Sequence, residues 1–205
     1  MTDHPIKAII FDLGGVLLDW DPRHVYRDVF GGDEAAVESF LSEIDFYGWN
    51  QHQDAGRTFD DAAEALCAQH PRWCEQIRIY GQRYVHSFGG ALEPTVAILR
   101  QLKAAGWPLY ALSNFPPGKF DETRARFDFL NLFDDTVISG EVKLTKPDPR
   151  IYKLALERTG RRAEQCVFID DVPVNVAAAA SLGIDAIRFE TAEQLSGELR
   201  RRGIL

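Results

Sequence analysis

The 205-residue chain has room for one core domain plus an insertion, and 45% of its residues are hydrophobic, enough to fill a packed interior. Its net charge of −8 and sequence pI of about 5.1 disfavour nonspecific binding to nucleic acid or to an anionic membrane. We therefore expect neither as a partner. A small anionic substrate would need a locally positive pocket or a bound cation.

Nothing in the sequence predicts export or membrane insertion. No apolar run is long enough to span a bilayer, and the N-terminus lacks the basic and apolar regions of a signal peptide. Cys67, Cys74 and Cys166 show no paired metal-site spacing, and an odd count favours reduced thiols over a disulfide framework. We expect a cytoplasmic protein that is a monomer or a weak homodimer.

The chain opens on an apolar run, residues 7–11, that predicts a buried strand ending on Asp12. A carboxylate at the end of a buried strand is costly unless something pairs with it. Gly14 and Gly15 follow, and glycines let the backbone turn tightly and approach a ligand. Ligands of parallel sheets bind at this end of the strands, so Asp12 is the first candidate for chemistry; a capping role is the alternative.

Residues 18–92 predict a helical insertion. A turn-like link at 18–23 precedes apolar residues at helical spacing, such as Val37, Phe40 and Leu41, with no strand signal among them. Gly89 and Gly90 mark the return to the core. Trp20 is expected to be a packing residue.

From Glu93 onward, strands alternate with helices. Predicted strands lie at 108–113, 136–139, 166–170 and 186–189. Such alternation is typical of a parallel sheet covered on both faces. The predicted fold is therefore α/β: a doubly wound, Rossmann-like parallel sheet formed by residues 1–17 and 93–205, with an inserted α-helical domain at 18–92.

Three predicted strands end in polar groups: Asp12, Ser113-Asn114 and Asp170-Asp171. If these strands are neighbours, the groups converge, and carboxylates close to Asp12 would repel one another unless a cation lies between them. Hard oxygen ligands favour Mg²⁺. The alternative for the acidic pair is a polar strand-to-helix turn.

Lys146 supplies the missing positive charge. A lysine in a Pro-rich turn is usually only solvated, and a lone Ser113 is more often a satisfied hydroxyl than a phosphate ligand. The order of these residues along one α/β chain is what favours a shared site.

In this order the residues resemble the haloacid dehalogenase-like hydrolase superfamily, in the subgroup with a helical cap inserted after the first motif. The resemblance covers the whole chain. Its four motifs are matched by residues 11–16, by Ser113 with Asn114, by Lys146 with Pro147, and by Asp170-Asp171 with Asn175.

The resemblance implies a Mg²⁺-dependent phosphatase acting on a small phosphorylated metabolite. Asp12 would attack phosphorus to form an aspartyl phosphate, which water then hydrolyses. The implied metal ligands are Asp12, the Gly14 carbonyl and Asp171, with Asp170 acting through water.

The same resemblance implies how the phosphoryl group is bound. Ser113, Lys146 and Asn114, together with backbone N–H groups after Asp12 at Gly14 and Gly15, would hold its oxygens.

One position departs from the family pattern. Family phosphatases usually carry a second Asp two positions after the nucleophile, where this chain has Gly14. Loss of a general acid costs roughly 10²–10⁴-fold in rate. Either another group protonates the leaving oxygen, or the leaving group departs readily. We hypothesise a sugar 1-phosphate, also because a subgroup with a similar Asp-Leu-Gly motif includes a glucose 1-phosphate phosphatase.

Residues 49–57 form the most polar and aromatic stretch of the insertion. We predict that His52, Gln53 and Arg57 face the leaving group; the alternative is a solvated helix–helix loop.

Two other functions compete. A 2-haloacid dehalogenase would use the same Asp12 without metal, but that branch typically has an aromatic residue at the position of Gly14 and Ser-x-Asn in place of Asp170-Asp171. A catalytically silent ligand-binding protein is compatible with Gly14, although the rest of the chemistry is present.

Overall fold

The computed structural model describes residues 6–205. Residues 1–5, which belong to the predicted core domain and to the N-terminus judged not to be a signal peptide, lie outside the described residues. Its centre is a five-stranded parallel sheet with strand order β5-β4-β1-β6-β7. The strands are β1 (Ala8–Phe11), β4 (Leu109–Ser113), β5 (Asp135–Ile138), β6 (Cys166–Asp170) and β7 (Asp185–Arg188). The predicted α/β class with a Rossmann-like parallel sheet is confirmed.

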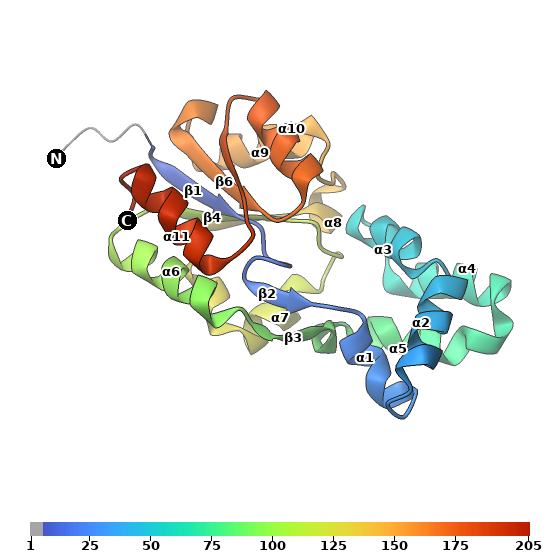
Figure 1. Ribbon diagram of the computed structural model, residues 1–205. Coiled ribbons are helices and arrows are strands. Elements are labelled where there is room, and N and C mark those ends of the chain that lie inside the picture. Colours follow the sequence, from blue (N-terminus) through green and yellow to red (C-terminus); the bar gives the residue numbers. More distant parts are fainter. Residues whose placement is uncertain (1–5) are drawn as a thin grey trace.

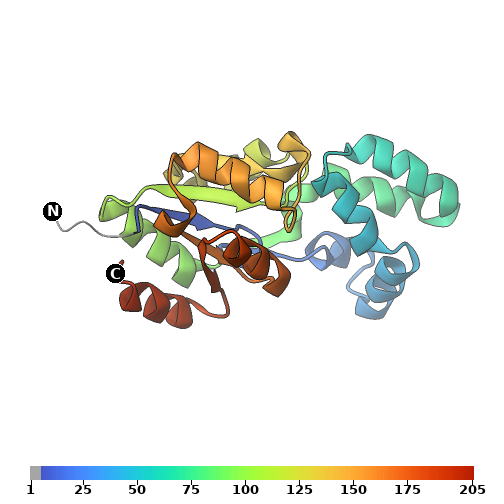
Figure 2. The same cartoon turned by 90° about the horizontal axis from the view of Figure 1, so that it is seen from above.

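Helices cover both faces of this sheet (Figures 1 and 2). Successive side chains of a strand point to opposite faces, so β1 contributes Ile10 to one side and Ile9 to the other. Ile10 belongs to the core beneath α9 (Pro149–Thr159) and α10 (Pro173–Ser181), and Ile9 to the core beneath α6 (Glu93–Ala104) and α11 (Ala192–Arg201). Burial on both sides explains why β1 is continuously apolar.

Shorter elements connect the sheet strands. They are α7 (Phe120–Arg126), η3 (Asp128–Leu132), α8 (Ser139–Val142) and η4 (Ala163–Gln165). Of these, α8 directly follows β5 and lies at the carboxyl end of the sheet (Figure 1).

Residues 23–87 form a separate group of helices beyond the carboxyl end of the sheet, here called the helical lobe (Figures 1 and 2). It consists of α1 (Arg23–Val29), α2 (Glu34–Glu43), α3 (Phe46–Asp54), α4 (Phe59–Gln69), η1 (Pro71–Trp73), α5 (Cys74–Gln82) and η2 (Tyr84–Ser87).

The prediction that residues 18–92 contain no strand is wrong at both ends of the segment. β2 (Leu18–Trp20) and β3 (Phe88–Ala91) form an antiparallel ribbon that leads the chain into and out of the helical lobe. Strands this short carry too few residues to show an alternating pattern. The domain boundaries themselves stay a prediction.

The interior of the helical lobe is aromatic. The ring of Tyr80 lies 4.8–6.0 Å, centroid to centroid, from those of Tyr26, Phe46, Trp49 and Phe59. Aromatic pairs at these separations add to the free energy of burial. Four helices therefore share one central ring.

Cys67 of α4 and Cys74 of α5 form a disulfide, with their Cα atoms 4.6 Å apart. The expectation of reduced thiols is wrong for this pair, because the turn through η1 brings the two helix ends together. Cys166 is buried and free. No helix in residues 6–205 has the length and apolar character to cross a membrane. Location and oligomeric state stay predictions.

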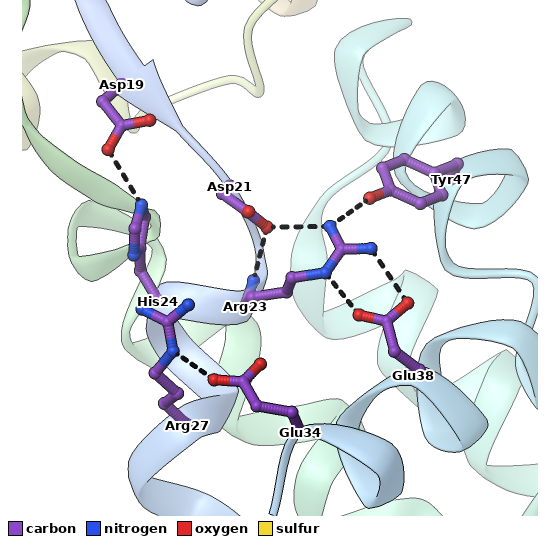
Figure 3. A network of polar contacts seen from close by, with 8 residues as sticks. All are labelled: Asp19, Asp21, Arg23, His24, Arg27, Glu34, Glu38 and Tyr47. Carbon is purple, nitrogen blue, oxygen red and sulfur yellow. Dashed lines mark hydrogen bonds and ion pairs between the residues drawn. The ribbon is translucent and has the colours of Figure 1, made fainter. Parts of the chain in front are cut away.

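A polar network joins the first three helices of the lobe at its entrance (Figure 3). The Arg23 guanidinium donates to both carboxylate oxygens of Glu38 on α2, at 2.5 and 2.9 Å. It also donates to Asp21 at 3.1 Å and to the Tyr47 hydroxyl of α3 at 3.0 Å. This side chain therefore links α2 and α3 to the segment that follows β2.

Candidate active site

The strand register places Asp12 at the middle of the sheet edge. β4 and β6 lie on either side of β1, and Phe11 pairs with Ala111 of β4 and with Ile169 of β6. Asp12 is the next residue, and its N–H donates to the Ile169 carbonyl at 2.8 Å. Its side chain therefore lies between the ends of two neighbouring strands.

Lys146 connects Asp12 to Asp170. Its Nζ lies 2.8 Å from Asp12 Oδ2 and 2.6 Å from Asp170 Oδ2. Burial alone would lower the pKa of Lys146, but the two carboxylates outweigh it and raise that pKa. Lys146 therefore stays charged inside the protein.

Asp170 is held on both of its oxygens. Its Oδ1 accepts from the Val172 N–H at 2.9 Å and from Asn175 Nδ2 at 3.1 Å. Its Oδ2 accepts from Lys146 and from Asn175 at 3.2 Å. These bonds satisfy a fully buried carboxylate, and they fix the direction of Lys146.

Ser113 and Asn114, at the end of β4, act on the same lysine and aspartate. The Asn114 amide donates to the Lys146 carbonyl at 3.1 Å and accepts from the Lys146 N–H at 2.8 Å. Asn114 lines the cavity, but both ends of its side-chain amide bind the backbone of Lys146. Its contacts therefore position Lys146. The Ser113 hydroxyl hydrogen-bonds Asp12 and so opposes the burial that raises the pKa of that carboxyl.

Ligand oxygens of Asp12, Asp170 and Asp171 lie within 4.8 Å of one another. Burial raises the pKa of Asp12 to about 7, although Lys146 opposes the shift, and burial together with Asp170 raises the pKa of Asp171. Three carboxyls lie here, and Lys146 pairs with two of them, Asp12 and Asp170. A donor set of clustered carboxylate oxygens fits a hard divalent cation such as Mg²⁺.

Gly15 is needed where Asp171 approaches the loop after β1. A Cβ at this position would lie 2.5 Å from Asp171 Oδ2, and the φ of +74° is one that other residues rarely adopt. The N–H of Gly15 donates to the Leu18 carbonyl at 2.9 Å, and its predicted role in phosphate binding stays a prediction. Gly14 lines the cavity.

A cavity of about 290 Å³ opens above these groups. Asp12, Lys146 and Asp171 are exposed to it at one end. An aromatic wall and two side chains of α3 complete the lining; these residues are Trp20, Tyr84, Phe88, Phe115, Asn50 and Asp54. Trp20, expected only to pack, is thus part of the wall. A larger hollow of about 550 Å³ lies between α4 and α5 and includes none of the active-site carboxylates.

The structure does not place His52, Gln53 and Arg57 at this cavity. His52 is exposed, and Gln53 is fully buried and donates to the Trp49 carbonyl at 2.6 Å. Arg57 donates to the Asp61 carbonyl at 3.1 Å. For His52 and Gln53 the physical reason is helix phase, because α3 turns the face of Asn50 and Asp54 toward the cavity; Arg57 lies beyond the end of α3.

Asn50 and Asp54 lie on the face of α3 that lines the cavity. Residues four apart lie on one face of a helix, and neither His52 nor Gln53 is among the residues that line the cavity. The spacing of these two polar residues within the stretch 49–57 was the available signal. The sequence does not show which face of α3 meets the core. The pair Asn50 and Asp54 therefore could not be preferred over the other polar residues of this stretch.

A sequence profile described as haloacid dehalogenase-like hydrolase matches residues 6–183. The chain belongs to this family and is a hydrolase. It is 27% identical to the sesquiterpene phosphatase astK of Aspergillus oryzae, over 95% of each chain. It is also 27% identical to the drimenol cyclase drtB of Aspergillus calidoustus, a longer protein of which it spans 36%, aligned over 95% of this chain.

The chain is also similar to dehalogenases. It is 26% identical to an (S)-2-haloacid dehalogenase of Pseudomonas putida, over 87% of this chain and 82% of that protein. Among solved structures, a HAD family enzyme of Bacteroides thetaiotaomicron, in complex with magnesium and inorganic phosphate, has a TM-score of 0.72 at 25% identity. The match covers 95% of this chain and 100% of that one.

Proposed function

We propose that this hydrolase is a Mg²⁺-dependent phosphatase that acts on a small phosphorylated metabolite. The observation that carries the proposal is the cluster of Asp12, Asp170 and Asp171 beside Lys146. These carboxylates would repel one another and a phosphate group, and a divalent cation would relieve both repulsions. The Bacteroides enzyme, whose complex holds magnesium and inorganic phosphate, supports this assignment.

Asp12, the Gly14 carbonyl and Asp171 would hold the cation. Asp170 would act through water, because both of its oxygens already bind Lys146 and Asn175. When bound, the cation would shield the Asp12 carboxylate from the negative charge of the phosphate.

Asp12 would be the nucleophile that attacks phosphorus and becomes an aspartyl phosphate. The Lys146 ammonium, which contacts Asp12, would hold a phosphoryl oxygen together with the Ser113 hydroxyl. Because these donors are fixed before substrate arrives, they stabilise charge that develops in the transition state without further reorganisation.

The identity of the leaving group is the finer part of the proposal. The sugar 1-phosphate predicted from Gly14 is one candidate. The aromatic wall of Trp20, Tyr84, Phe88 and Phe115 supports a leaving group with an apolar face, and the relative astK is a sesquiterpene phosphatase. A substrate panel therefore includes both chemical classes.

The competing function is dehalogenation of a 2-halo acid by Asp12, which the similarity to the Pseudomonas enzyme favours. Such a reaction binds an anionic acid and releases a halide. In this site the 2-halo acid and the halide would both lie near Asp171, whose negative charge repels them. Lys146 is already paired with Asp12 and Asp170. The extra carboxylate therefore supports phosphatase chemistry.

The test is release of inorganic phosphate from a panel of sugar phosphates, prenyl monophosphates and aryl phosphates, with Mg²⁺ and with a chelator. We expect hydrolysis only with the metal, and a loss of roughly 10⁴-fold or more in Asp12→Asn. Halide release from a 2-halo acid in the presence of chelator would reverse the assignment.

A further inference from the structure

Asp54 is the acidic residue that the helical lobe presents to the cavity. It is the last residue of α3, and it shares the cavity with Asp12 and Lys146. It also lines a smaller adjoining hollow with Lys146 and Thr145. Its carboxyl therefore lies on the side of the cavity opposite the sheet, where the leaving group of a substrate attacked by Asp12 would lie.

The backbone at Asp54 is docked on the sheet domain. The Ser139 hydroxyl, at the start of α8, donates to the Asp54 carbonyl at 2.6 Å and accepts from the Phe115 N–H at 2.8 Å. Gly56 has a φ of +104°, and a Cβ there would lie 3.0 Å from the Gly140 carbonyl. The end of α3 thus fits closely against α8, as Figure 1 shows for the two helices.

The Asp54 side chain has few polar partners. Asn50, one turn earlier on the same helix, donates to Asp54 Oδ2 at 3.4 Å, and the Oδ1 of this buried asparagine has no partner among the described residues. Neither group forms an ion pair within residues 6–205 that would hold Asp54 ionised. Since no ion pair stabilises the carboxylate, Asp54 can be protonated and can donate that proton.

Charged and titratable groups face Asp54 from several elements. Asp12 follows β1, Lys146 follows α8, and Tyr80 and Tyr84 lie on α5 and η2. Lys143 passes beside Gly56, and Asp171 lines the same cavity. Burial raises the pKa of Asp54 to about 7, with Asp12 adding to the shift and Lys146 opposing it. A carboxyl with such a pKa is matched to proton transfer near neutral pH.

We propose that Asp54 is the general acid and base of this enzyme, supplied by the helical lobe in place of the acid that is absent at Gly14. This inference rests on the proposed phosphatase function. In this chain the proton donor would therefore belong to the segment that also lines the leaving-group side of the cavity.

The two half-reactions balance as follows. As an Asp12 oxygen bonds to phosphorus and the ester P–O bond breaks, the carboxyl proton of Asp54 passes to the departing alkoxide, which leaves as an alcohol. Water then attacks the phosphorus of the aspartyl phosphate and gives its proton to the Asp54 carboxylate. The P–O bond to Asp12 breaks, hydrogen phosphate leaves, and both aspartates return to their starting states.

The test compares Asp54→Asn with wild type on a simple alkyl phosphate and on p-nitrophenyl phosphate, both with Mg²⁺. An alkoxide needs a proton to depart and nitrophenolate does not. We expect kcat/KM to fall about 10²–10³-fold on the alkyl ester and less than about tenfold on the aryl ester. Asp60→Asn, an exposed acid of the same lobe outside this cavity, is the matched control and should change neither.

The pH profile gives a second readout. Since the acid must be protonated, wild-type kcat/KM on the alkyl ester should decline above about pH 7, and Asp54→Asn should lose this decline. A merely structural role would not remove one limb of the profile.

A rescue variant completes the test. A Cβ at Gly14 would meet Trp20 Cβ at 3.7 Å, an ordinary contact, so a side chain can begin there without a clash at its first atom. Adding Gly14→Asp to Asp54→Asn should recover at least about tenfold on the alkyl ester. Equal losses on both esters, or no loss on either, would overturn the role of Asp54 while leaving the phosphatase function standing. If wild type releases phosphate from neither ester nor from the substrate panel above, the phosphatase function fails, and the role of Asp54 fails with it.

Discussion

The sheet edge and the helical lobe supply the two sides of one cavity by different means. On the sheet side, Asp12 and Asp170 follow from strand register, and Lys146 pairs with both through buried contacts. On the lobe side, Asn50 and Asp54 depend on the phase of one helix and on its docking through Ser139. The sheet side therefore depends on strand register, and the lobe side depends on how one helix packs.

The sheet and the helical lobe also differ in the side chains that fill their cores. The strands of the sheet are mostly aliphatic and are buried on both faces, whereas the lobe is packed around aromatic rings. A ring contact between Tyr84 and Phe115, with centroids 5.4 Å apart, joins the two. We infer that substitutions in the sheet should affect every substrate, and substitutions in the lobe should affect some substrates more than others.

The largest expected effect is that of Lys146→Met. It leaves Asp12 and Asp170 buried without their cation, so we expect a loss of activity of about 10³-fold on every ester and a destabilisation of about 3–5 kcal/mol. Burial would then raise the pKa of Asp12 in the folded state further above its unfolded value, because Lys146 no longer opposes the shift. Folding therefore becomes less favourable as pH rises, and the deficit should shrink as pH is lowered.

Urea unfolding of Lys146→Met at several pH values measures this deficit. Asp12→Asn, which removes activity but keeps the lysine paired with Asp170, is the control and should remain folded. A deficit that does not change with pH would contradict the role of the buried charges.

Gly15→Ala should have the next largest effect. Its Cβ would collide with the Asp171 carboxylate, so we expect the Mg²⁺ concentration for half-maximal activity to rise by about tenfold. Gly118→Ala is a close control, because Gly118 has a φ of +72° but nothing within 4 Å of an added Cβ. If both variants need the same higher magnesium concentration, backbone conformation is responsible and not contact with Asp171.

Ser139→Ala should affect the leaving-group side selectively. It removes the hydroxyl that binds the Asp54 carbonyl, and loss of one such bond costs about 1 kcal/mol. We expect about a fivefold lower kcat/KM on an alkyl phosphate and little change on an aryl phosphate. Steady-state kinetics on the two esters would show the difference. An equal loss on both esters would mean that Ser139 supports the stability of the fold and not the leaving-group side of the cavity.

The smallest effect on activity is expected from Cys67→Ser. The bond to Cys74 closes a short loop far from the cavity, so its loss should lower the stability of the lobe by roughly 2 kcal/mol without changing kinetics on an aryl phosphate. Thermal unfolding with and without a thiol reductant measures the same quantity in wild type. A wild-type protein insensitive to reductant would argue that the lobe does not depend on this bond.

The sequence by itself determined the sheet and the residues at its carboxyl edge. Buried parallel strands are continuously apolar, and the polar residue that ends each one is visible without coordinates, as at Asp12, Ser113 and Asp170. That these strand ends meet at one site depends on the strand order and register, which the structure supplies.

Only the tertiary structure decided which face of α3 meets the cavity, and so brought Asn50 and Asp54 there instead of His52 and Gln53. It also decided the ribbon of β2 with β3 and the disulfide between Cys67 and Cys74. The physical reason is that helix phase, short strand pairs and thiol pairing depend on contacts between distant segments. No local pattern of residues records those contacts.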